Sequence, residues 1–344
     1  MGPPLAGAFG ASKSNRAARP VAVAVASLLL LAGRPHGAEQ QRLHLWPRFA
    51  IGQTLHYQIE TRATTNAKAT TPIENPEGPS QFRQAVSLIV RLDVLDAQVG
   101  REGTTGPTKI RATYEKSAAT FESDAFDPQA ALLQGQYDRL EGRSLEFTIE
   151  PDGKLSSLKG IEDVLANPSA AGAARAWLSE LSSGAAIPKR GIAVSEKWSG
   201  EQLLPGTPLA GMVWRTESTY LRNEPCRAED AVTAETLKTD AAAGTVATCA
   251  VILTRFNISR GGQGDATPED YRRNGLRTSG TWTGSGESLD SISISTGLLI
   301  SSTQTSSQEM NYEIVSASSG SKMRYAGRVE SQSQITLLPE APPS

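Results

Sequence analysis

Alternation of apolar and polar residues over long segments is the feature that most limits how this chain can fold. Between residues 85 and 95 every second position is apolar: Val86, Leu88, Val90, Leu92 and Val94. Successive side chains of a β-strand point to opposite faces, so this spacing predicts a strand with one buried face. Similar patterns occupy residues 55–62, 109–121, 144–150, 212–221, 245–258, 280–294, 298–315 and 322–338. The sequence therefore predicts a mainly β fold.

The last strands indicate how the sheets are built. They are rich in Ser, Thr and Gln, and apolar residues such as Ile300 and Ile314 share one face. A sheet with one apolar and one polar face is typically antiparallel, with its polar face in water. Tight hairpins are expected at Pro151-Asp-Gly153 and at Ile294-Ser-Thr-Gly-Leu298.

Few helices are expected. Asp127-Pro128 and Asn167-Pro168 are typical helix starts and predict helices near residues 128–140 and 168–183. Gly and Pro residues at 184–192 indicate a boundary. The predicted organisation is a signal peptide (1–38), an N-terminal β unit that contains both helices (39–185), a C-terminal antiparallel β unit (186–339) and a tail (340–344). Two architectures fit: two β units, or one long-stranded half-barrel with helices on its concave face.

The N-terminus has the three parts of a secretory signal. Basic residues up to Arg19 precede an apolar run at 21–32, and small residues and Pro35 follow. A run of this length is too short to span a membrane. We therefore expect export to the periplasm or the exterior, with a mature chain that begins between residues 34 and 39 and contains no transmembrane segment.

Charge argues against one class of partner. Without residues 1–38 the chain has 30 basic and 36 acidic residues, a formal charge of −6. A protein of this sign has no general attraction for nucleic acid, so no nucleic-acid partner is expected.

Cys226 and Cys249 are the two cysteines of the chain. In an oxidising compartment they are expected to form a disulfide, although two buried free thiols would also fit the sequence. No histidine lies near either cysteine, and no metal site is predicted.

Catalytic constellations are mostly absent. The three histidines are His36, inside the signal, and His44 and His56, in or near the first strand. The sequence contains no nucleophile elbow, no phosphate-binding glycine loop and no His-Glu-x-x-His motif. Carboxylate pairs such as Asp93 with Asp96, or Glu217 with Glu309, leave a carboxylate-dependent hydrolase as an alternative. We assign no catalytic residue and expect no cofactor.

Several short motifs carry a resemblance. They are Gly-x-x-Leu-x-Tyr57, Leu-Asp-Val-Leu-Asp96, Ala-Thr-Tyr114, Phe-Thr-Ile-x-Pro-Asp-Gly-Lys154 and Gly-Ile-Glu-Asp-Val-Leu165. Together the chain from 52 to 338 resembles an uncharacterised family of exported bacterial β-rich domains, distantly similar to lipoprotein-carrier half-barrels. It departs from that family's pattern where Ser195 replaces a glycine. The resemblance implies an exported β-rich fold and assigns no activity.

Long strands with one apolar face need cover, and two helices offer little of it. One prediction is therefore a hydrophobic groove lined by Val86, Leu88, Val90, Tyr114, Trp177 and Leu181. The alternative is that these residues form a closed core. The favoured function is noncatalytic binding of an apolar ligand or another envelope component, such as an envelope protein. A structural or assembly factor without a small ligand is the second hypothesis.

Overall fold

The computed structural model describes residues 42–70, 80–99, 105–125, 128–151, 153–160, 178, 181, 187–204, 207–226, 247–262 and 264–339. All of them belong to one compact unit that starts at Gln40. The predicted signal peptide and the C-terminal tail lie outside the described residues, and so does the predicted helix near 168–183 apart from Leu178 and Leu181.

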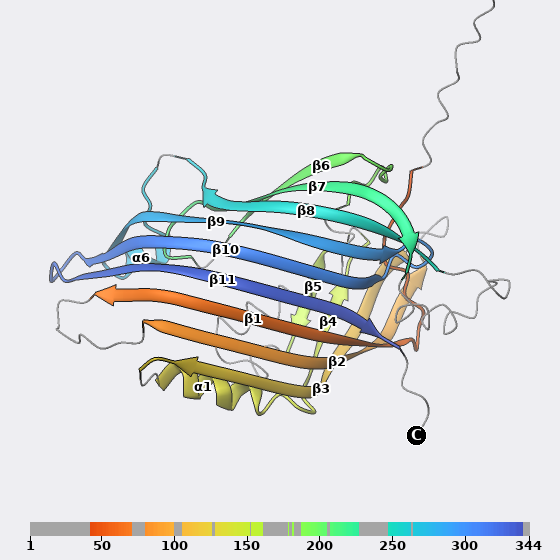
Figure 1. The fold of residues 1–344 in the computed structure, drawn as a ribbon, viewed down its shortest axis with the longest axis horizontal. Coiled ribbons are helices and arrows are strands. Elements are labelled where there is room, and N and C mark those ends of the chain that lie inside the picture. The colour runs from red at the N-terminus through yellow and green to blue at the C-terminus, as the bar shows by residue number, and fades with distance from the viewer. Residues whose placement is uncertain are drawn as a thin grey trace, which may run out of the picture. The chain divides into compact units, whose positions relative to one another are not determined.

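The described strands form one open antiparallel sheet (Figure 1), which confirms the predicted mainly β, antiparallel fold. The strands are β1 (Thr54–Thr70), β2 (Gln81–Val99), β3 (Thr105–Ser123), β4 (Ser144–Ile149), β5 (Leu155–Lys159), β6 (Lys197–Leu203), β7 (Met212–Pro225), β8 (Thr248–Arg260), β9 (Leu276–Ser293), β10 (Leu299–Ser316) and β11 (Lys322–Leu338). Their order across the sheet is β5-β4-β3-β2-β1-β11-β10-β9-β8-β7-β6.

The first and last strands meet in the middle of this sheet. Strand β1 pairs with β11 from His56 opposite Leu338 to Thr70 opposite Arg324, and Figure 1 shows the two strands side by side. Strands from both predicted β units therefore belong to one sheet. The predicted boundary at 184–192 lies between β5 and β6, which are the two edges of the sheet.

Two described helices accompany the sheet. Helix α1 (Pro128–Tyr137) confirms the prediction near 128–140 and packs on β3, where the Ser117 hydroxyl donates to the Tyr137 carbonyl at 2.8 Å. Helix α6 (Glu269–Arg273) was not predicted and lies in the glycine-rich connection before β9. Its acidic first turn and basic last turn complement the helix dipole. The helix is too short to produce a periodic pattern in the sequence.

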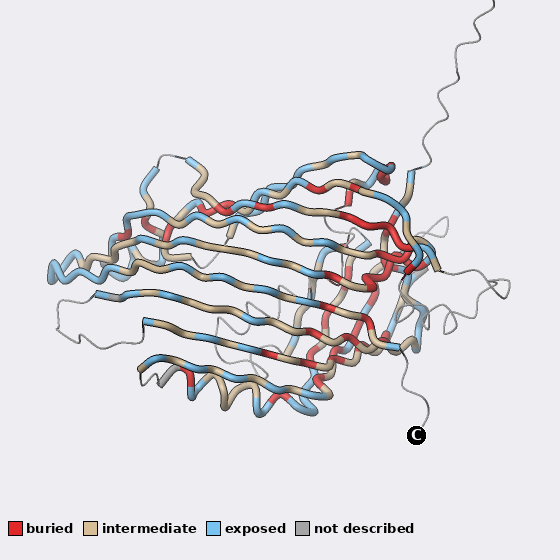
Figure 2. The backbone as a smooth tube through the Cα atoms, in the orientation of Figure 1, coloured by how far each residue is buried: buried red, intermediate tan, exposed pale blue. Residues whose placement is uncertain are grey.

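The core gathers at one end of the sheet (Figure 2). We call the face that carries Tyr57, Leu88 and Ile335 the inner face and the opposite one the outer face. In the core, strand pairing brings apolar residues of the inner face next to one another. Tyr57, for example, stands opposite Val90 on one neighbouring strand and Leu337 on the other. Farther along, the strands have small polar residues on the inner face, and a second small cluster forms around Met212 and Ile258.

Candidate functional site

The residues predicted to line a hydrophobic groove are placed mostly in the core. Five of them are no more than 9% exposed and belong to one apolar cluster: Val86, Leu88, Val90, Tyr114 and Leu181. Burial raises the pKa of the Tyr114 hydroxyl above its ordinary value. Trp177 lies outside the described residues. This arrangement favours the closed-core alternative, and a ligand-binding role for these residues stays a prediction.

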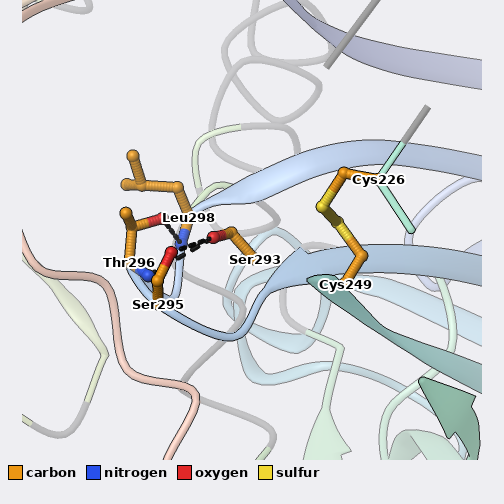
Figure 3. The surroundings of a disulfide bond; sticks show 6 residues. All are labelled: Cys226, Cys249, Ser293, Ser295, Thr296 and Leu298. Atoms are coloured by element: carbon orange, nitrogen blue, oxygen red, sulfur yellow. Dashed lines mark hydrogen bonds between the residues drawn. A yellow bond between two sulfur atoms is a disulfide. The ribbon is translucent and has the colours of Figure 1, made fainter. Parts of the chain in front are cut away.

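The predicted disulfide is confirmed. Cys226 and Cys249 are joined with an S–S distance of 2.00 Å and a Cα–Cα distance of 5.1 Å (Figure 3). Strands β7 and β8 pair as neighbours, and the Cys226 amide donates to the Ala247 carbonyl at 2.8 Å. Both cysteines are buried, so the disulfide connects these two strands within the core.

A tight turn lies beside the disulfide and joins β9 to β10 (Figure 3). Gly297 has a φ of +68°, which confirms the predicted hairpin with glycine at the positive-φ position. A Cβ atom at Gly297 would lie 2.0 Å from the Trp46 carbonyl oxygen. The Arg48 amide donates to the Thr296 carbonyl at 2.7 Å. The turn therefore anchors the segment that precedes β1.

Asp290 on β9 is a carboxylate placed among inner-face residues. It stands opposite Ile252 on one side and Ser302 on the other. The hydroxyls of Ser302 and Ser288 donate to it at 2.7 and 3.4 Å. Burial raises the pKa of Asp290 from 3.8 to about 6, against the lowering effect of these hydrogen bonds.

The registers bring no second acid to Asp290. Every other Asp and Glu of the described strands lies on the outer face, or at the β3 bulge where Glu115 contacts outer-face residues. A hydrolase of the two-carboxylate type needs a partner within about 5 to 9.5 Å. Asp290 is therefore a half-buried acid without the partner that this chemistry requires among the described strands.

In each acid pair considered from the sequence, one acid is held by neighbouring side chains. Asp93 accepts from the Thr54 hydroxyl and from Arg91 Nε, each at 3.1 Å. Glu217 on β7 pairs with Lys197 at 3.3 Å. Strands β8 and β9 separate Glu217 from Glu309 on β10.

A pocket with a volume of about 680 Å³ lies over the adjacent strands β8, β9, β10, β11 and β1. The side chains that alternate onto the outer face provide most of its lining, and we call it the outer pocket. Arg62 and Glu330 stand at its β1–β11 end, and Arg255 and Glu287 stand at its β8–β9 end. Short hydroxyl side chains complete the lining: Thr64 and Ser285 lie at the two ends, and Thr305 and Ser307 on β10 lie between them.

The lining of the outer pocket contains two arginines and two glutamates. Arg255 Nε lies 3.7 Å from Glu287 Oε2 across the β8–β9 ladder. Glu330 Oε1 lies 2.8 Å from Nη2 of Arg328, on the same strand. Arg62 has no ion-pair partner within the described part of the chain, so its guanidinium is free to donate to a bound molecule.

Sequence reasoning missed the outer pocket. The Ser, Thr and Gln residues of β10 and β11 were interpreted as a face in water, and most of them are at least partly exposed. The signal that could have drawn attention to them is the cluster of short hydroxyl residues on consecutive strands. Five strands bring these residues into line with one another. Their alignment depends on the registers between strands that are distant in sequence, and a single sequence does not reveal these registers.

No family model matches the sequence, and no curated protein matches it either. The resemblance to exported bacterial β-rich domains therefore stays a prediction. Within the described residues, no helix has the length and apolar character needed to cross a bilayer.

Proposed function

We propose that this chain is an exported cell-envelope protein that binds an envelope component noncatalytically in the outer pocket. The observation that carries the proposal is the chemistry of that pocket: it is large and rich in hydrogen-bonding groups. The signal-like N-terminus and the disulfide support a location outside the cytoplasm.

The surroundings of the two carboxylates argue for binding without catalysis. Glu287 stands opposite Thr305, and Glu330 stands opposite Ser307, with β10 between them. Strand spacing and rise place their Cα atoms about 12 Å apart. Glu287 is drawn toward Arg255 on β8, away from β10. Glu330 likewise contacts Arg328 at 2.8 Å, so each carboxylate already lies beside an arginine and the arrangement fits a binding surface better than a hydrolytic centre.

The same pocket favours an envelope component over an apolar ligand. The one hydrophobic residue in its lining is Ala63, and the alternation along β1 places its methyl group on the inner face, away from the pocket. An apolar ligand would need a lining that is mostly hydrophobic. The apolar residues of the inner face are instead used in the core.

A structural or assembly role is the alternative, and strand β6 is the observation that favours it. Strand β6 is one edge of the sheet, and Leu203 at its end is 69% exposed. Edge strands present unpaired backbone groups to which a strand of another protein can be added. Lys197 and Glu201 on this strand oppose unspecific pairing.

Co-sedimentation of the purified mature protein with envelope fractions of its host tests the proposal. Wild-type protein is expected to sediment with one fraction, and the Arg62→Gln/Arg255→Gln double variant is expected to stay in the supernatant. Arg324→Gln is the matched control, because Arg324 lies on the outer face of β11 outside the pocket lining. Equal sedimentation of all three proteins, or release of small products from the fraction over time, would contradict the proposal.

A further inference from the structure

We infer that the outer pocket takes an uncharged polyhydroxylated chain, a segment of a neutral oligosaccharide that lies across the strands. The inference rests on the proposed function and names the ligand class of the same site. It follows from the donors and acceptors of the lining, from its shape and from its balance of charge.

The lining can serve both roles of a sugar hydroxyl, which donates and accepts hydrogen bonds. Guanidinium groups donate in a planar fork, carboxylates accept, and Ser and Thr hydroxyls do both. Each end of the pocket combines one donor side chain with one acceptor side chain: Arg62 with Glu330, and Arg255 with Glu287. Arg62 stands opposite Gln332, so Glu330 is its diagonal neighbour across the β1–β11 ladder. Adjacent hydroxyls of one sugar ring can satisfy such a pair.

The shape of the pocket suits an extended chain. Five neighbouring strands span about 19 Å across the sheet, whereas two outer-face positions along each strand span about 7 Å. Long side chains stand at the two ends, and the short side chains of Thr305 and Ser307 lie on β10 between them. A narrow ligand that crosses the strands fits these proportions better than a compact one.

The glutamates beside the arginines disfavour polyanions. Arg62 and Arg255 lie four strands apart, and each has a glutamate as a cross-strand neighbour. Phosphate groups of nucleic acids or anionic lipids are bound by clustered basic residues, without carboxylates beside them. With two arginines and two glutamates in its lining, the pocket favours a ligand without net charge.

The sheet also excludes the common way of holding a peptide. Each of the five strands is paired on both sides, since β8 lies between β7 and β9 and β1 lies between β2 and β11. Their backbone groups are used in the ladders, so an extended peptide cannot be added as a further strand there. The lining also lacks apolar recesses for peptide side chains.

Isothermal titration calorimetry on the full mature chain tests the inference. The probes are tetrasaccharides of glucose and of N-acetylglucosamine, a galacturonate tetrasaccharide and a serine-rich tetrapeptide. We expect a neutral tetrasaccharide to bind, with an affinity that changes less than about 2-fold between low and high salt, because no net charge is neutralised. Arg62→Gln/Arg255→Gln is expected to weaken binding by about 10-fold or more, and Arg324→Gln by less than about 2-fold.

Ser307→Trp provides a second test, since a bulky side chain on β10 should fill the middle of the pocket and abolish binding. Melting temperature and the intact disulfide verify that each variant is folded. Preference for galacturonate or for the peptide would overturn the inference, and so would equal saccharide binding by all variants. Binding of an envelope fraction without binding of any saccharide would overturn the inference and leave the proposed function standing. If neither the fraction nor a saccharide binds, both are wrong.

Discussion

Ser302 and Asp290 stand opposite each other across the β9–β10 ladder, and the Ser302 hydroxyl donates to the Asp290 carboxylate at 2.7 Å. This bond only partly offsets the loss of solvent, because burial still raises the pKa of Asp290 from 3.8 to about 6. The sheet therefore holds an acid whose ionised form is less stable in the folded protein than in the unfolded chain.

Asp290→Asn is expected to stabilise the protein in a pH-dependent way. The folded pKa is raised, so the contribution of the protonated acid to stability is fully present below pH 3.8 and is lost as the pH rises through about 6. At pH 8 the variant should unfold with a free energy up to about 3 kcal/mol higher than wild type, and near pH 3.5 the two should agree. Urea unfolding at both pH values measures this difference.

Ser302→Ala is the companion variant to Asp290→Asn. It removes the hydroxyl that lowers the pKa of Asp290, so its destabilising effect should be larger at pH 8 than at pH 3.5. A loss of stability by Asp290→Asn at pH 8 would show that the ionised carboxylate is not a cost to the fold.

The disulfide is expected to contribute about 3 kcal/mol to the free energy of unfolding, because it closes a loop between residues 23 positions apart. Cys226→Ser/Cys249→Ser should lose that amount in denaturant unfolding. Thiol labelling of unfolded wild-type protein without reductant should find no free thiol. Reductant should lower the stability of wild type and leave that of the double variant unchanged. Equal stability of the two proteins without reductant would contradict the prediction.

Gly297→Ala is expected to destabilise the protein by more than about 2 kcal/mol. An alanine there must adopt a φ of +68°, and its Cβ would meet the Trp46 carbonyl at 2.0 Å. Gly320→Ala is a matched control, with a φ of +69° and no heavy atom within 4 Å of the added Cβ. It should cost only about 1 kcal/mol, the strain of the backbone alone. Similar melting temperatures for the two variants would indicate that the contact with Trp46 is unimportant.

Export predicts a processed N-terminus. Protein recovered from the envelope of its host should begin between residues 34 and 39, because the apolar run ends at Ala32 and small residues follow. Intact-mass measurement determines the first residue. Recovery of envelope protein that still carries Met1 would contradict the prediction.

Much of the fold near the core was predictable because burial produces a pattern. Leu92 lies between Arg91 and Asp93, and its ladder partners Leu55 and Ala112 are also apolar and buried. The extension of β1 from residue 63 to Thr70 was not predicted, because Ala, Thr, Asn and Lys there have no strong alternation. That part of β1 is strand because β2 and β11 pair with it, and tertiary pairing decides such segments.

The site was harder to predict than the fold. The cysteine pair could be assigned because two cysteines allow one connectivity. The outer pocket could not, because Arg62 and Arg255 are brought into one lining only by the order of five strands. Hydroxyl residues on a polar face look the same in a sequence whether they face water or a ligand.

The pairing of β1 with β11 also determines when the sheet can form completely. A chain that crosses a membrane with its N-terminus first delivers β11 last, and the outer pocket needs both strands. Until then β1 has one open edge and the two halves of the sheet are not joined. Pairing between segments this distant in sequence is slow to form. The predicted export of this chain would thus suit its topology, because the central ladder would assemble only after β11 has emerged.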